Sequence, residues 1–201
     1  MSMKRLTLLL LVASAVILAD AQTSMRSLII AMPDSVLPLL TQVNREDCVD
    51  FREAGMRACV TNRLGTTTEL TELTSDYACW QYTASTIYEM KLLPLADSLQ
   101  VLCMTHRLQD PVFDASLRFF DLQWNPLPSE QFIALPSSAT TAALYSTTDY
   151  VLSPSSPTLT VTARQEYIDL ETSDNADMAV HIQTRPTLFQ WKDGRFVEES
   201  E

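Results

Sequence analysis

The chain has 201 residues, with 14 Lys and Arg against 25 Asp and Glu, and a formal net charge of −11. The acidic residues are spread along the chain and no basic stripe is present to bind phosphates. This composition argues against nucleic acid and against an anionic membrane surface as partners. The length suffices for one hydrophobic core of good size or for two small ones.

The first residues have the pattern of a secretory signal peptide. Lys4 and Arg5 form a charged start, residues 6–18 form an apolar stretch, and Ala19-Asp20-Ala21 places small residues at the two positions that a signal peptidase reads. We therefore expect residues 1–21 to be removed. The apolar stretch is shorter than the roughly 20 residues that cross a membrane, and no cysteine at the cleavage point offers a lipid anchor. The mature chain is expected not to span a membrane.

Four cysteines remain after cleavage: Cys48, Cys59, Cys79 and Cys103. In an exported protein this number favours disulfides, and three pairings are possible. Cys79 and Cys103 fall on the first and third strands of the meander described below, about two strand spacings apart, which is beyond disulfide reach. Cys59–Cys79 is the favoured pair, although four free thiols stay an alternative. Cys103 alternates with apolar residues and is expected to be buried.

Two short helices are predicted ahead of the sheet. Residues 27–32 form a short apolar run, after which Asp34 is expected to cap a helix that continues to Val43. Asn44 is expected to cap a second helix that ends at Gly55.

Residues 76–121 predict an antiparallel meander, because apolar and polar side chains alternate with a period of two. One face of the run 87–92 carries three apolar side chains: Tyr88, Met90 and Leu92. Glu89 and Lys91 occupy the opposite face. Residues 58–62 and 66–73 are predicted to be strands as well.

The segment after Asp121 is expected to interrupt the sheet, because Pro126 and Pro128 lack N–H donors. Residues 129–134 are predicted to form about two helical turns. Alternation then resumes in the segments 159–167, 178–183, 188–191 and 195–197. Asp193-Gly194 predicts a two-residue hairpin turn between the last two.

One local match suggests an internal repeat. Thr74-Ser-Asp-Tyr77 corresponds to Thr147-Thr-Asp-Tyr150 at a spacing of 73 residues. We predict an α+β fold of two tandem repeats, each a short helix or helix pair followed by an antiparallel β-meander sheet. The first repeat would span residues 22–126 and the second residues 127–201, and both tyrosines should then begin a strand. The alternative is the ordinary rhythm of a β-rich chain.

Four segments of the first half carry a family resemblance: Met32-Pro-Asp-Ser-Val-Leu-Pro-Leu-Leu-Thr41, Val60-Thr-Asn-Arg-Leu-Gly65, Leu73-Thr-Ser-Asp-Tyr77 and Glu89-Met-Lys-Leu-Leu93. As a set they resemble a Bacteroidales family of exported proteins that is known only as a domain of unknown function. The resemblance implies export to the periplasm or cell surface of a Gram-negative bacterium, and it brings no activity or cofactor. The predicted plan is also similar to small inhibitors of the β-lactamase-inhibitor type, by fold analogy alone.

Candidate catalytic and metal-binding residues are few. His106 and His181 are the two histidines, and Cys103 and His106 should point to opposite faces of one strand, which argues against a Cys–His nucleophile. With three glycines and no Gly-x-Ser-x-Gly motif, the chain offers no phosphate-binding loop and no nucleophile elbow. The carboxylates in the acidic loop 169–177 are of a type that binds calcium, but the loop lacks glycine and EF-hand spacing, so a solvated loop is preferred. No cofactor is predicted.

Aromatic side chains fall mostly on predicted strands, and most are expected in the core. Both faces of the strand after Asp76 nevertheless carry bulky side chains. We therefore predict that one sheet face is an aromatic contact surface. Its residues would be Trp80, Tyr82, Trp124 and Trp191.

Because no catalytic set converges in the sequence, our first hypothesis is a non-enzymatic exported module that binds or inhibits a protein in the cell envelope. One alternative is a hydrolase-like enzyme whose site lies between the repeats and uses Asp76, Asp149, His106 or His181. The other is a glycan-binding accessory protein that uses exposed Trp and Tyr. A pocket lined by titratable groups with shifted pKa values would favour the enzyme, and a flat exposed patch would favour the binding module.

Overall fold

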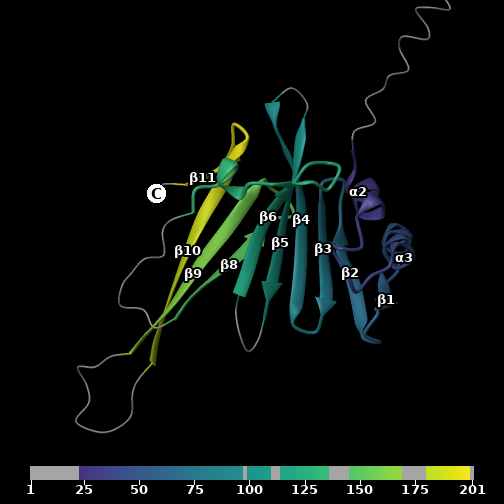
Figure 1. The fold of residues 1–201 in the computed structure, drawn as a ribbon, viewed down its shortest axis with the longest axis horizontal. Helices are drawn as coiled ribbons and strands as arrows, with labels where there is room; N and C mark the ends of the chain where they lie inside the picture. Colours follow the sequence, from purple (N-terminus) through teal and green to yellow (C-terminus); the bar gives the residue numbers. More distant parts are fainter. Residues whose placement is uncertain (1–22, 97–98, 110–113, 136–144, 169–179, 200–201) are drawn as a thin grey trace, which may run out of the picture.

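The computed structural model describes residues 23–96, 99–109, 114–135, 145–168 and 180–199, so the predicted signal peptide lies outside the described residues. Two short helices precede two antiparallel sheets (Figure 1). The predicted α+β class with antiparallel sheet is therefore confirmed. In the described part of the chain, no helix combines the length and the apolar character that crossing a membrane requires.

Sheet A has seven strands and sheet B has four, and every pairing within them is antiparallel. The strands of sheet A follow chain order: β1 (Cys59–Thr61), β2 (Thr67–Leu73), β3 (Tyr77–Thr83), β4 (Thr86–Pro94), β5 (Gln100–Leu108), β6 (Asp114–Phe120) and β7 (Pro126–Leu127). Those of sheet B lie in the order β11 (Arg195–Glu198), β10 (Val180–Lys192), β9 (Thr158–Ile168) and β8 (Tyr145–Leu152). The Asp193-Gly194 hairpin is confirmed, since both residues have the positive φ angles, 50° and 78°, of a type I′ turn.

Each helix buries one stripe at the i, i+3, i+4 spacing of an amphipathic helix. Helix α2 (Met25–Ala31) is capped by Ser24 and buries Met25, Leu28 and Ile29. Helix α3 (Gln42–Glu53) begins with a capping box between Thr41 and Asn44, and it buries Arg45, Cys48 and Val49.

The predicted helix from Asp34 to Val43 is wrong. Residues 34–40 form consecutive turns, and α3 begins only at Gln42. Pro33 and Pro38 flank this stretch and disfavour a continuous helix. Asp34 does not act as a cap, because its carboxylate binds two arginines instead.

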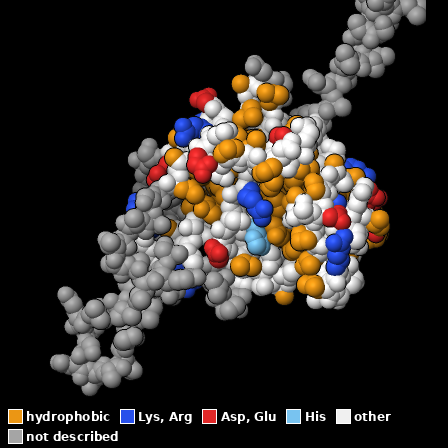
Figure 2. Space-filling view, in the orientation of Figure 1, with side chains coloured by type: hydrophobic (Ala, Val, Ile, Leu, Met, Phe, Trp, Pro, Cys, Tyr) orange, Lys and Arg blue, Asp and Glu red, His pale blue; other side chains and the backbone are white. Residues whose placement is uncertain are grey.

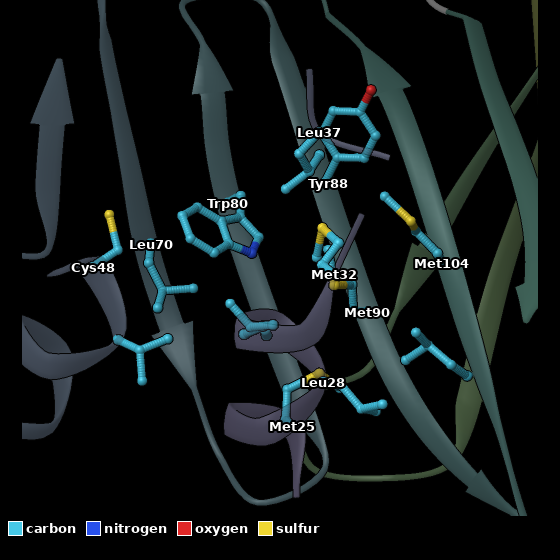
Figure 3. Close-up of a cluster of buried hydrophobic side chains, with 14 of the residues drawn as sticks. Met25, Leu28, Met32, Leu37, Cys48, Leu70, Trp80, Tyr88, Met90 and Met104 are labelled. Carbon is cyan, nitrogen blue, oxygen red and sulfur yellow. The ribbon is translucent and has the colours of Figure 1, made fainter. Parts of the chain in front are cut away.

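The central strands of sheet A are buried on both faces over much of their length, because the helical segment covers part of one face and sheet B covers part of the other. Alternate residues of its central strands belong to two separate cores. On β3, Ala78 and Trp80 enter the helix-side core (Figure 3), whereas Tyr77 enters the inter-sheet core. This arrangement explains the bulky side chains on both faces of that strand.

The two covering layers are offset along sheet A. Helix α3 packs against β1 and β2 at one end of the sheet, and β8 of sheet B packs against β4, β5 and β6 at the other. In Figure 1 the helices accordingly lie over the β1–β3 end, and sheet B lies beyond β6. The helix-side face is therefore left without a helix over parts of β4, β5 and β6.

The structure does not confirm the tandem repeat. Tyr77 is the first residue of β3, and its N–H donates to Thr74 Oγ1 in the preceding turn. Tyr150, by contrast, lies inside β8, close to its C-terminal end. Among the described residues, sheet B is preceded only by the one-turn 3-10 helix η2 (Ser129–Gln131), which is also shorter than the two turns predicted there.

The predicted boundary between residues 126 and 127 falls inside β7, which pairs with Phe119 and Phe120 of sheet A. Pro126 is tolerated there because β7 is an edge strand, where a missing N–H costs no ladder bond. Beyond this point the two sheets still share the inter-sheet core. The chain therefore forms two sheets around a common core.

The four cysteines are free, so the favoured Cys59–Cys79 disulfide is absent from the structure. Cys59 lies on β1 and Cys79 on β3, and the intervening β2 separates them. Two predictions are confirmed: β4 separates Cys79 from Cys103, and Cys103 is fully buried.

Candidate functional site

The predicted aromatic contact surface is wrong, because its residues belong to the two cores. The exposed fractions are 0% for Trp80, 4% for Tyr82, 6% for Trp124 and 7% for Trp191. The indole N–H groups of Trp124 and Trp191 donate to backbone carbonyls within the fold. These side chains stabilise the structure and offer no surface to a protein or a glycan.

The residues of the enzyme alternative do not converge. Asp76 pairs with Lys91 and Asp149 pairs with Arg107, so ion pairs occupy both carboxylates. His106 lies on the opposite, helix-side face of sheet A, where its ring stacks on Tyr88. The side chain of His181 and the acidic loop 169–177 lie outside the described residues.

A cluster of charged and polar side chains joins the two sheets. Its centre is Glu89 on β4, which is 5% exposed and points toward sheet B. The Glu89 carboxylate accepts hydrogen bonds from the hydroxyls of Tyr77 and Thr105, at 3.0 and 3.2 Å. It also accepts the backbone N–H of Leu152 on β8, at 3.2 Å. The side chain of Glu89 on sheet A thus accepts a backbone N–H from β8, which is an edge strand of sheet B.

Two further cations of sheet A hold the same part of sheet B. The Lys91 ammonium is 3.0 Å from Asp76, and it donates to the carbonyl oxygen of Pro154 at 2.9 Å. Arg107 donates two hydrogen bonds of 2.8 Å to Asp149 on β8. This bidentate geometry fixes orientation as well as distance. Three side chains of sheet A, those of Glu89, Lys91 and Arg107, therefore hold β8 and the turn after it.

The electrostatics of this inter-sheet cluster reflect its burial. Burial raises the pKa of Glu89, against the effects of the Leu152 N–H, Arg107, Tyr77 and Thr105. Burial and then the Glu89 charge raise the pKa of Tyr77 far above its usual value. A surface hollow of about 330 Å³ lies elsewhere, beside α2, lined by Ser24, Arg26, Arg52, Glu53, Leu73, Thr74 and Ser75. The cluster is a closed, hydrogen-bonded junction between sheets, which suits a structural role.

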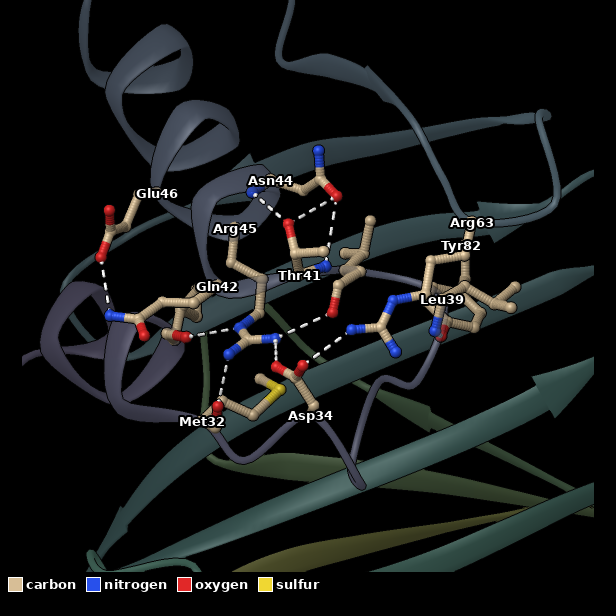
Figure 4. A network of polar contacts seen from close by, with 12 residues as sticks. Met32, Asp34, Leu39, Thr41, Gln42, Asn44, Arg45, Glu46, Arg63 and Tyr82 are labelled. Carbon is tan, nitrogen blue, oxygen red and sulfur yellow. Dashed lines mark hydrogen bonds and ion pairs between the residues drawn. The ribbon is translucent and has the colours of Figure 1, made fainter.

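A second buried cation shapes the helix-side face. Arg45 of α3 is 2% exposed, and its guanidinium donates to the carbonyl oxygens of Ile29, Met32 and Leu40 (Figure 4). One Asp34 oxygen pairs with Arg45 at 2.9 Å, and the other pairs with Arg63 at 2.8 Å. This network fastens the turns of residues 33–40 to both helices.

The fastened turns border the uncovered part of sheet A. The N–H of Leu39 donates to the Tyr82 hydroxyl at 2.6 Å. The Tyr82 ring in turn packs edge-to-face on the Tyr88 ring, with centroids 4.9 Å apart. The Tyr88 hydroxyl points away from the core cluster in Figure 3. Arg45 therefore positions a wall next to Tyr88.

Beyond this wall, sheet A presents what we call the open face, formed by Tyr88, His106, Leu108, Ser116 and Arg118 on β4, β5 and β6. Cross-strand register places Tyr88 opposite His106, and His106 opposite Ser116. The Tyr88 and His106 rings stack with centroids 4.5 Å apart and an interplanar angle of 18°. Figure 2 shows this side of the molecule, with a histidine next to a basic side chain among hydrophobic side chains.

Two polar groups of the open face have no partner among the described residues. In the described part of the chain, neither the Tyr88 hydroxyl nor the Arg118 guanidinium makes a hydrogen bond or an ion pair. Burial raises the pKa of Tyr88, and Arg118 opposes that shift. Burial and the Arg118 charge lower the pKa of His106, with Asp114 acting in the opposite direction.

Sequence reasoning placed His106 on the face opposite Cys103, which is confirmed, but it missed the pairing with Tyr88. Alternation assigns each side chain to a face of its own strand. It does not assign the register between β4 and β5. The two rings meet only because Tyr88 and His106 are directly opposite.

We predict that Glu89→Gln changes how stability depends on pH. Because the folded-state pKa of Glu89 is raised above its reference value of 4.5, the folded state binds more protons than the unfolded state. The stability that the Glu89 side chain contributes is fully present below its pKa in the unfolded state, and it is lost as pH rises through its pKa in the folded state. The free energy of unfolding of Glu89→Gln minus that of the wild type should therefore rise with pH above about 4.5 in urea titrations.

Glu69→Gln is the matched control. The hydrogen bond from Arg57 lowers the pKa of Glu69, so its contribution is present above the unfolded pKa and lost as pH falls through the folded pKa. The free energy of unfolding of Glu69→Gln minus that of the wild type should therefore fall as pH rises. Equal slopes for the two variants would contradict the burial of Glu89.

We also predict that Arg45→Leu destabilises the fold by about 3–5 kcal/mol, because removing one partner leaves the other buried polar groups uncompensated. Arg63→Leu removes an arginine that pairs with the same Asp34 but is 49% exposed, and it should cost under about 1 kcal/mol. Urea unfolding of both variants gives the comparison. Similar costs would show that Arg45 does not fasten the turns as described.

Comparisons with known proteins agree with this fold. The chain belongs to the family described as "Protein of unknown function (DUF3256)", whose model matches residues 17–196. It is similar to a solved structure described as a domain of an uncharacterized protein from Porphyromonas gingivalis W83, with 24% identity and a TM-score of 0.65 over 88% of this chain and 98% of that one. At this identity the likeness shows the fold alone. No curated protein matches the chain.

Proposed function

We propose that this family member is a non-enzymatic, exported binding module that contacts a protein partner in the envelope of a Gram-negative bacterium through its open face. Export is supported by the charged, apolar and small-residue pattern of residues 1–21. The resemblance to exported Bacteroidales proteins supports the same location.

The proposal rests on the Tyr88 hydroxyl and the Arg118 guanidinium, which lie on the same face of sheet A and have no partner among the described residues. Although Tyr88 is only 7% exposed, its hydroxyl is not a buried unpaired atom and points away from the core (Figure 3), so water can reach it and an acceptor on a partner can replace that water. Aromatic and arginine side chains also dominate binding energy in protein interfaces. Hydrophobic side chains surround the histidine on this side of the molecule (Figure 2), which suits contact with a protein surface.

The proposal is tested by capture from envelope extract of a Bacteroidales host, using immobilised mature chain. Arg118→Glu reverses the charge at the open face, and Arg195→Glu makes the same change at an exposed arginine of sheet B. We expect the wild type and Arg195→Glu to retain the same protein, and Arg118→Glu to lose at least about 90% of it, since a charge at an interface centre is worth a factor of ten or more.

Equal capture by all three chains would place the contact elsewhere and overturn the proposal. The same holds if nothing is retained by the wild type. Fractionation of the producing cells supplies the second readout, because a chain found in the cytoplasm with residues 1–21 attached would remove the exported role.

A further inference from the structure

We propose, on the basis of the function above, that the group recognised by the open face is the carboxylate of an Asp or Glu side chain on the partner. Arg118 would bind the carboxylate, and the Tyr88 hydroxyl and the His106 ring would supply further hydrogen bonds.

The first support is that Arg118 is left unpaired in a strongly acidic chain. Five other arginines each pair with a carboxylate: Arg26, Arg45, Arg57, Arg63 and Arg107. Arg52, Arg118, Arg185 and Arg195 make no such pair within the described residues, and of these Arg118 is the one on the open face, where it is exposed on β6. An arginine that a chain of net charge −11 leaves free is available to a carboxylate from outside.

The second support comes from comparing the buried tyrosines of sheet A. The Tyr77 hydroxyl donates to Glu89, and the Tyr82 hydroxyl accepts the N–H of Leu39. The Tyr88 hydroxyl has no partner among the described residues, although its ring is buried to a similar degree. Arg118 and Tyr88 lie on the same face of sheet A. A carboxylate has two oxygens and can offer an acceptor to each of them.

The third support is the charge of the site. The groups that face His106 are Tyr88 from β4 and Arg118 and Asp114 from β6. Of the residues that form the open face, only Arg118 is a lysine or arginine, and Asp114 at the start of β6 opposes its effect on the pKa of His106. One positive charge matches the single negative charge of a carboxylate better than the double charge of a phosphate.

The arrangement favours a side-chain carboxylate over a chain terminus. Terminal carboxylates are captured by backbone N–H groups gathered in a nest. Here the backbone groups of β4, β5 and β6 are used in the ladders of sheet A. The donors are side chains on an open sheet face, which an Asp or Glu projecting from a partner surface can approach.

The test uses two isomeric probes and records the imidazole signal of His106 by NMR in the full mature chain. N-acetylisoglutamine carries its free carboxylate on the side chain, N-acetylglutamine carries it on the main chain, and N-acetylglutaminamide has none. We expect N-acetylisoglutamine to shift the signal saturably and to raise the pKa of His106, since a nearby negative charge favours the imidazolium. N-acetylglutamine should bind at least about threefold more weakly than N-acetylisoglutamine, and N-acetylglutaminamide should cause no shift.

Variants assign the effect to named groups. Arg118→Gln should weaken binding of N-acetylisoglutamine by about tenfold or more, and Tyr88→Phe by about threefold, as expected for charged and neutral hydrogen bonds. Arg195→Gln is the control on sheet B and should have no effect. The position of the His106 signal in the free variants shows whether each one is folded.

Absence of a saturable shift with N-acetylisoglutamine, equal binding of the two isomers, or loss of binding in Arg195→Gln would each overturn the inference. If capture from envelope extract still depends on Arg118 while the carboxylate probes fail, the open face is a contact surface for a different chemical group. If both fail, the proposed function falls as well.

Discussion

The offset covering of sheet A is the constraint on which the rest of this structure depends. Its central strands bury both faces, one against the helices and the other against sheet B. Because α3 covers β1 and β2 whereas β8 covers β4, β5 and β6, the layers do not overlap fully. The open face is the part of the sheet that this offset leaves uncovered on the helix side, and its location follows from the packing of the cores.

Buried charge has different consequences in the two interfaces of sheet A. Between the sheets, Glu89, Lys91 and Arg107 are satisfied by groups of sheet B, so the charges fix how the sheets meet. On the helix side, Arg45 satisfies three carbonyl groups and holds the turns that border Tyr88. Such groups are costly when one partner is removed. By contrast, the Tyr88 hydroxyl and the Arg118 guanidinium on the open face have no partner among the described residues.

Alternation in the sequence predicted most of sheet A, because half-buried and fully buried strands both show a period of two. It could not tell that the bulky residues of β3 face two cores, since that depends on sheet B arriving from distant sequence. This is why Trp80 and Tyr82 were assigned to a surface. The repeat between Tyr77 and Tyr150 was a local match, and the strand positions of the two residues differ. Tyr88, His106 and Arg118 come together only through the register of three strands.

The central claim, that the open face is the binding surface, is tested most directly by placing a photo-crosslinking residue at Ser116, next to His106, in the exported chain. Thr67 is the control position, because it is exposed on the opposite face of sheet A. The account predicts that irradiation in cells joins one partner protein to the chain at Ser116, that Arg118→Gln abolishes this product, and that Thr67 yields none. A product at Thr67 with none at Ser116, or a Ser116 product unaffected by Arg118→Gln, would contradict it.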